Sequence, residues 1–237
     1  MAGLEYVQLV ASLPNLGPML AAKAAPINRV RLQTRLQQML RNEHLAEINA
    51  AASVIAWPRQ PLRETDAELV SKALQVIPTL KSATLRHLVE EQLELRTVVA
   101  ALRRRHAGQD APPAGEDWGY GRYVKRIRAN WREPGFGLER TLKWLMPVKE
   151  RLDNDDAPGV ERILLEVAWR GADRLSGGHD FDFEAVVLYV VRWILLDRWT
   201  RYDAEAAAAR FDQLVNDALD AAPASLKTDA DLMEAAA

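Results

Sequence analysis

The most apolar run of the chain is FDFEAVVLYVVRWILLDRW, from Phe181 to Trp199, and it constrains the fold more than any other feature. Between Ala185 and Leu196 the only charged residue is Arg192, and apolar residues fall on every face of a helix drawn through this run. A helix that is apolar all round is buried within a protein or lies in a membrane, and a span needs about 20 predominantly apolar residues. The apolar part of this run, Ala185–Leu196, has only twelve residues and is interrupted by Arg192. It therefore predicts a central helix over 181–199, buried in a helical core.

Composition excludes several classes of protein. Of the 237 residues, 49% are hydrophobic and 27% are charged, which is typical of a folded globular chain. The net charge of −2 leaves no overall field that would draw the chain to nucleic acid or to an anionic membrane. The absence of cysteine excludes disulfides, thiolate metal sites and cysteine nucleophiles. The first residues lack the basic segment of a secretory signal, so we expect a cytoplasmic protein.

The rest of the chain predicts further helices, and the fold class we predict is all-α. Only residues 4–13 are too short to assign as helix or strand. Thr65 and Glu68 have the spacing of a capping box and start one helix, which Pro78 breaks or kinks. A long helix follows over 79–106. Other predicted helices cover 27–40, 42–55, 119–132, 136–152 and 160–175, with a last one that Asp203 caps. Trp57-Pro58 and Pro61 predict turns after the helix over 42–55.

A linker divides the predicted helices into two groups. Residues 108–116 read GQDAPPAGE, rich in glycine and proline and almost without apolar side chains. We therefore predict two packed helical modules, an N-terminal one over 1–107 and a C-terminal one over 118–222, joined by a linker over 108–117. Residues 223–237 have little to bury, and we expect a frayed tail.

No pattern of catalytic or metal-binding residues emerges. The four histidines lie in different segments, and only His87 has a carboxylate, Glu91, four residues away on a predicted helix. The acidic turn over 153–156 starts like a calcium loop but has Pro158 where the loop needs glycine and Leu164 where it needs glutamate. No phosphate-binding loop or nucleophile–base arrangement is present. We predict no enzyme activity, no metal and no cofactor.

One predicted helix, over 119–132, is basic and aromatic. Cations interleaved with aromatic side chains are able to bind phosphates and stack bases, whereas a cationic helix face also suits an acidic protein partner or plain solvent. Tyr123, Ile127 and Trp131 recur every four residues and form the buried stripe of an ordinary amphipathic helix. We predict a partner-contact surface here, with an adaptor or nucleic-acid-binding role as the alternative. Its cations are Arg122, Lys125, Arg126, Arg128 and Arg132.

Arg192 is the one charge inside the apolar part of the predicted central helix. An unpaired buried charge is costly, so the side chain must reach water or pair with a carboxylate. Glu166 and Asp173, on the preceding predicted helix, are the candidate partners. The alternative is that Arg192 faces another protein of an assembly.

Three segments carry a resemblance to a known family. They are YVQLVASLPNL at Tyr6–Leu16, RIRANWREPGFGLERTLKWL at Arg126–Leu145, and the run at Phe181–Trp199 followed by Arg210-Phe211. The chain resembles, from Tyr6 to about Leu219, a family of uncharacterised bacterial proteins encoded together with V/A-type ATPases. That family is similar to the socket component of the ATPase rotor, which is designated C in these enzymes and d in their eukaryotic homologues.

The resemblance implies a non-catalytic coupling role. The socket component is an all-helical, funnel-like protein without cofactor, and it joins the central stalk to the proteolipid ring on the cytoplasmic face of the membrane. The resemblance therefore implies a peripheral membrane protein in ion transport, whose partners are the stalk and the ring. The socket component has roughly three helical modules, whereas this chain predicts two. The cationic surface is inferred from the residues and not from the family.

Overall fold

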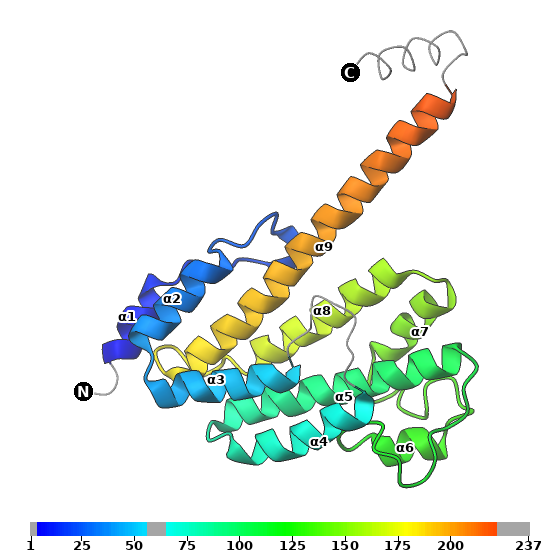
Figure 1. Cartoon of the computed structure of the whole chain (residues 1–237), viewed down its shortest axis with the longest axis horizontal. Coiled ribbons are helices and arrows are strands. Elements are labelled where there is room, and N and C mark those ends of the chain that lie inside the picture. The colour runs from blue at the N-terminus through cyan, green and yellow to red at the C-terminus, as the bar shows by residue number, and fades with distance from the viewer. Residues whose placement is uncertain (1–3, 56–64, 222–237) are drawn as a thin grey trace.

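The computed structural model describes residues 4–55 and 65–221, with side chains for 5–55 and 65–202. Within these ranges the chain is all-α and contains no strand, as predicted. Figure 1 shows the arrangement of the helices. Their bounds are α1 Leu4–Ser12, η1 Met19–Ala21, α2 Arg29–Met39, α3 Asn42–Ile55, α4 Asp66–Val76, η2 Ile77–Thr79, α5 Ala83–His106, α6 Val124–Ala129, α7 Leu145–Asp153, α8 Ala157–Arg174 and α9 Phe183–Ala221, where η marks a 3₁₀ helix.

Local capping determines where the first helices begin. The segment over 4–13, left open between helix and strand, forms α1. The side chain of Asn28 accepts the N–H of Arg31 at 2.9 Å, so α2 begins after Asn28 and not at residue 27. The capping box of Thr65 and Glu68 is present at the start of α4. The turns predicted at 57–61 lie outside the described residues.

The long helix α5 begins later than predicted. Residues 77–79 form a 3₁₀ turn around Pro78, and Ser82 is the N-cap because its hydroxyl accepts the N–H of Leu85 at 3.1 Å. The predicted start at residue 79 was therefore wrong. The N–H of Ser82 donates to Glu47 of α3 at 2.6 Å, and its hydroxyl donates to Glu184 of α9 at 3.0 Å. Ser82 thus connects the start of α5 to both α3 and α9 by hydrogen bonds.

The basic helix is much shorter than the predicted 119–132. The backbone N–H groups of Tyr120 and Arg122 donate to side chains of α5, Thr97 at 2.8 Å and Glu94 at 3.1 Å. Gly121 between them has φ +93°, which no right-handed helix contains. These bonds hold 119–122 as a loop on α5, so only the six residues of α6 are helical.

The predicted helix over 136–152 is also shorter, and only α7 forms. Phe136 adopts φ +56° and is fully buried. The guanidinium of Arg105 lies over its ring, 4.4 Å from the ring centroid, and the ring of Trp131 is 5.4 Å away. Burying the Phe136 ring therefore replaces the start of the predicted helix with tight turns up to Trp144.

The central helix continues well past its predicted end. Asp182 accepts the N–H of Ala185 at 2.8 Å, which caps the start of α9. No glycine or proline occurs between Phe183 and Ala221, so nothing local ends the helix. Asp203 therefore lies inside α9. The prediction that it caps a separate last helix was wrong. The predicted frayed tail over 223–237 lies outside the described residues.

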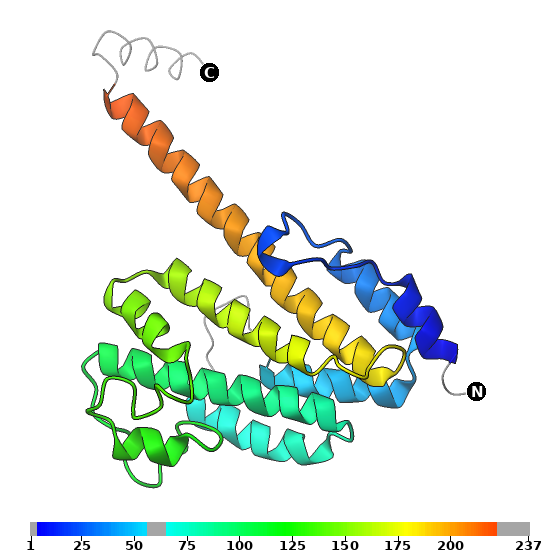
Figure 2. The same ribbon diagram turned by 180° about the vertical axis from the view of Figure 1, so that it is seen from behind.

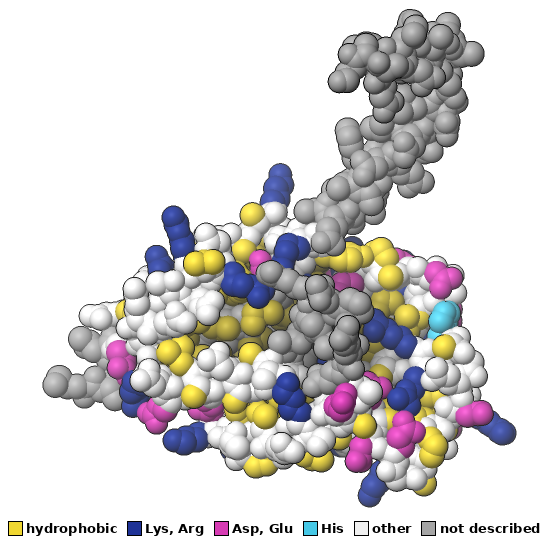
Figure 3. Space-filling view, viewed as in Figure 1, with side chains coloured by type: hydrophobic (Ala, Val, Ile, Leu, Met, Phe, Trp, Pro, Cys, Tyr) yellow, Lys and Arg dark blue, Asp and Glu magenta, His cyan; other side chains and the backbone are white. Residues whose placement is uncertain are grey.

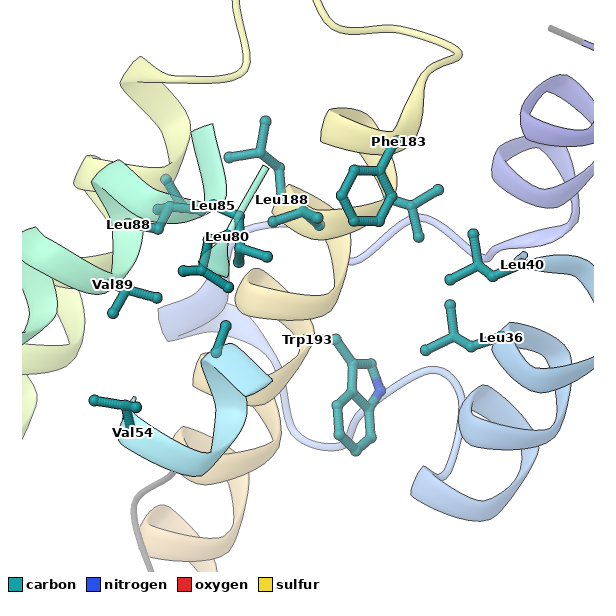
Figure 4. Close-up of a cluster of buried hydrophobic side chains, with 14 of the residues drawn as sticks. Leu36, Leu40, Val54, Leu80, Leu85, Leu88, Val89, Phe183, Leu188 and Trp193 are labelled. Carbon is teal, nitrogen blue, oxygen red and sulfur yellow. The ribbon is translucent and has the colours of Figure 1, made fainter. Parts of the chain in front are cut away.

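The core is divided into clusters that join both sides of the linker. In the largest cluster, Phe183 and Trp193 of α9 pack among side chains of α2, α3 and α5 (Figure 4). The indole N–H of Trp193 donates to the carbonyl of Ile27 at 2.8 Å. A second cluster packs the C-terminal half of α5 against α6, α7 and α8. The division into modules at 108–117 stays a prediction about independent folding.

Helix α9 has two parts with different surroundings. Up to about Tyr202 it lies against α1, η1, α5 and α8. Beyond that it extends away from the other described helices in both views (Figures 1 and 2). Among the described residues, no helix combines the length and apolar character needed to cross a membrane.

Candidate partner-binding site

A hydrophobic groove runs between α2, α3, α5, α8 and α9. Its cavity volume is about 480 Å³. Figure 3 shows hydrophobic side chains along the hollow between the α2 side of the molecule and the α3 and α5 side. The apolar lining includes Leu32, Leu36, Ile48, Ala52, Ile55, Leu88, Leu95, Val98, Val167, Ala168, Val187, Val190, Val191, Ile194 and Leu195.

The groove exists because α9 is apolar on every face but the helices of the described chain do not cover every face. Val187, Ile194 and Leu195 all line the groove, but Val187 and Leu195 are buried, whereas Ile194 is 40% exposed. A protein surface rarely leaves a large contiguous apolar patch uncovered unless it binds something. The uncovered face of α9 is therefore the floor of a candidate binding site.

Four ion pairs, which we call the rim pairs, surround this groove. Each joins an arginine that lines the groove to a carboxylate of a neighbouring turn or helix. The nitrogen–oxygen distances are 3.4 Å for Arg29–Asp197, 3.0 Å for Arg122–Glu94 and 3.4 Å for Arg174–Glu91, and the fourth pair is Arg198–Glu161.

The rim pairs present their positive ends outward. The side-chain exposures of arginine and carboxylate are 52% and 18% for Arg29–Asp197, 66% and 12% for Arg122–Glu94, 67% and 30% for Arg174–Glu91, and 32% and 13% for Arg198–Glu161. A guanidinium has five N–H donors, and a single carboxylate partner occupies only some of them. The remaining donors are able to bind a ligand. Each pair is neutral overall, and Glu91 and Glu94 also line the groove, so the edge offers a ligand unused guanidinium N–H donors at the three most exposed arginines.

Arg122 belongs both to the rim and to the predicted cationic surface. Its Nε donates to Glu94 at 3.0 Å, and its guanidinium lies 5.0 Å from the ring centroid of Tyr123. Burial alone lowers the pKa of Arg122, but the charge of Glu94 and the Tyr123 hydroxyl outweigh it and leave that pKa above its ordinary value. Arg122 is thus fixed in place as a cation.

The other four predicted contact residues differ in their surroundings. Arg126 donates to the carbonyl of Gly137. The Nε of Arg128 is buried without a hydrogen-bond partner among the described residues. Lys125 and Arg132 are exposed. Arg122 and Arg126 are exposed too, but Lys125 and Arg132 are the ones that make no hydrogen bond or ion pair within the described chain.

The partner of Arg192 lies within the chain. Its Nη2 is 3.1 Å from Oδ1 of Asp173, one of the two predicted carboxylates. The other, Glu166, pairs instead with Arg162 and Arg170 on its own helix. The Arg192 side chain is 23% exposed, and its Nε and Nη2 make no hydrogen bond of good geometry within the described part of the chain.

One group of side chains has the composition of a metal site. His179, Asp182 and Glu184 bring ligand atoms within 4.8 Å of one another. Each already has a structural role, because Nδ1 of His179 lies 2.7 Å from Asp182, Asp182 caps α9 and Glu184 accepts the Ser82 hydroxyl. These contacts cap the N-terminus of α9 and join it to the start of α5, which explains why the three side chains lie together. The predicted His87–Glu91 pair is present at 3.4 Å on the surface.

No protein-family model, curated protein or solved structure matches the chain. The site thus has to be interpreted from its own geometry. Sequence reasoning missed the groove because its walls combine helices from both ends of the chain, α2 and α3 with α5, α8 and α9. The signal that pointed toward it was the apolar face of 185–196, which the sequence alone predicted to be buried.

Proposed function

We propose that the protein is a non-catalytic component of a V/A-type ATPase, in which it couples the central stalk to the proteolipid ring as a rotor socket. The observation that carries the proposal is the apolar groove with outward arginines at its edge. A groove of this kind receives an amphipathic helix, whose apolar face enters while its polar face meets the rim. A stalk made of helices would present such a segment.

The sequence resemblance supports the same role, since the socket component of these ATPases is all-helical and so is the described part of this chain. The proposed role places the protein on the cytoplasmic face of the membrane, as a peripheral component of the complex. Charged residues around the groove would set the register of the stalk, because complementary charge orients partners more than it strengthens their binding. The role needs no cofactor.

The direct test is purification of the ATPase from cells that carry a tagged copy of this chain. We expect the stalk and the proteolipid ring to co-purify with it. Recovery of the tagged chain without either would overturn the proposal. Retention of nucleic acid with a steep dependence on salt would instead favour the alternative role of the basic segment.

The contribution of the cationic surface is tested by a double variant, Lys125→Glu with Arg132→Glu. Both side chains are exposed, so the change leaves the core intact, and we expect weaker recovery of the stalk or ring. The matched control is Lys23→Glu with Lys81→Glu, which makes the same charge change at exposed positions elsewhere. Equal recovery with both variants would exclude this surface as a contact while leaving the groove as the site.

A further inference from the structure

The outer part of α9 is a helix that stands apart from the rest of the described chain. From residue 203 to Ala221 the backbone is helical, and both views place it away from the other described elements (Figures 1 and 2). The whole helix has 39 residues and a length of about 58 Å. Helices in proteins are stabilised mainly by packing of an apolar face, and the described chain offers this outer part no element to pack against.

The sequence over 203–221 has the pattern of a helix that binds a partner. Ala207, Phe211, Leu214, Val215 and Ala218 recur at spacings of three and four, which places them on one face. Among the remaining positions, five carboxylates and one arginine give the segment a net charge of −4. The carboxylates are those of Asp203, Glu205, Asp212, Asp217 and Asp220, and the arginine is Arg210.

The groove on the body has the complementary properties. Its floor is apolar and its edge presents the exposed guanidinium groups of Arg29, Arg122 and Arg174 outward. An acidic helix with an apolar face would bury that face against Val191 and Ile194. Its carboxylates would then lie near these three guanidinium groups, where charge-assisted hydrogen bonds are stronger than neutral ones.

The outer part of α9 cannot fill the groove of its own molecule. The same unbroken helix supplies Val191, Ile194 and Arg198 to the groove, and it runs on away from the body (Figure 1). We propose that the occupant is the outer α9 of a second copy, with two copies exchanging these helices in a reciprocal dimer. In a two-fold symmetric dimer every contact occurs twice. The outer α9 of each copy would therefore occupy the groove of the other.

This inference uses the groove of the proposed function but does not depend on the ATPase assignment. A second copy in the groove and a stalk helix in the groove exclude each other. The dimer would therefore be the form of the protein outside the complex. Excess purified full-length protein should compete with stalk binding.

The first test measures self-association of the full chain by sedimentation equilibrium. We expect a monomer–dimer equilibrium that weakens as salt is raised. Ile194→Asp should raise the dissociation constant by about tenfold or more, because it places a charge on the apolar floor. Its control is Leu74→Asp, since Leu74 is also exposed, at 60%, but lies on α4 outside the groove.

The rim is tested by a pair of variants on one helix. Arg174 and Arg170 both lie on α8, both pair with a glutamate, and their side chains are 67% and 71% exposed. Of these two, Arg174 alone lines the groove. We expect Arg174→Glu to weaken the dimer about tenfold and Arg170→Glu to leave it within about twofold of wild type. Equal effects of the two would contradict a contact at the rim.

Complementation decides whether the outer helix and the groove meet each other. Phe211→Asp alters the helix, Ile194→Asp alters the groove, and each variant alone should dimerise at least about tenfold more weakly than wild type. A mixture of the two restores one intact helix–groove contact, so we expect a heterodimer. Absence of the heterodimer, or a wild-type chain that stays monomeric at its highest soluble concentration, overturns the inference. Co-purification with the stalk would then still support the proposed function, so the two failures are distinguishable.

Discussion

Arg192 is a charge that the apolar central helix keeps largely out of water. Among the described residues its ion-pair partner is Asp173, whose side chain is 65% exposed. Two of the guanidinium nitrogens make no hydrogen bond of good geometry within the described chain. Breaking a buried pair is costly, but replacing the charge itself with an apolar group of similar volume is often neutral or stabilising. We therefore expect the Arg192–Asp173 pair to orient α9 against α8 while adding little to the free energy of unfolding.

Two substitutions separate these effects. We expect Asp173→Asn to lower the free energy of unfolding by about 1 kcal/mol, because it leaves the guanidinium without its counter-charge. Arg192→Met should leave that free energy within about 0.5 kcal/mol of wild type or raise it. Urea unfolding followed by far-UV circular dichroism measures both, with the exposed Arg170→Met as control. A loss of more than about 2 kcal/mol in Arg192→Met would mean that the guanidinium is a net stabiliser.

At the level of elements, the loop over 119–122 shows how side chains of one helix determine the extent of the next. Thr97 and Glu94 of α5 accept the N–H groups of Tyr120 and Arg122. Gly121 supplies the positive φ that lets both bonds form, and a Cβ atom at this position would run into the Glu94 side chain. The loop fixes Arg122 at the rim of the groove.

Gly121→Ala should therefore destabilise the protein by about 2 kcal/mol, since it combines a strained backbone with a steric clash. Gly177→Ala is the matched control, because nothing lies within 4 Å of a Cβ atom there and its φ is not positive. We expect that control to be neutral or up to about 0.5 kcal/mol more stable. Thermal unfolding distinguishes the two, and similar melting temperatures would refute the docked loop.

Elements whose signals are local could be predicted from the sequence. The capping box of Thr65 and Glu68 depends on residues close in sequence. For Arg192 the sequence named two candidate carboxylates on the preceding helix and a partner protein, and only the structure selects Asp173. The extent of α6 was mispredicted because α5 binds the preceding loop from a distant part of the chain. The continuity of α9 was missed because Asp203, a good capping residue, was mistaken for a helix start. The groove depends on packing of five helices, which periodicity does not specify.

For the whole molecule, the packing joins the two halves that the linker suggests. Phe183 and Trp193 of α9 lie in the same cluster as Leu36, Leu88 and other residues that precede the linker. The C-terminal half of α5, also before the linker, forms a cluster with α6, α7 and α8. Separating the halves would expose both clusters to water, and burial of apolar surface is the main favourable term in folding.

We therefore expect the chain to unfold in one cooperative transition. Six of the seven tryptophans follow the linker, so indole fluorescence reports the C-terminal half, whereas far-UV circular dichroism reports helices throughout. The two signals should give the same midpoint in urea, because neither half keeps a complete core without the other. Circular dichroism that changes in two steps, with fluorescence following only one of them, would instead mean that 1–107 and 118–222 fold independently. In that case the contacts of α9 with the N-terminal half would be those of a docked interface and not of a shared core.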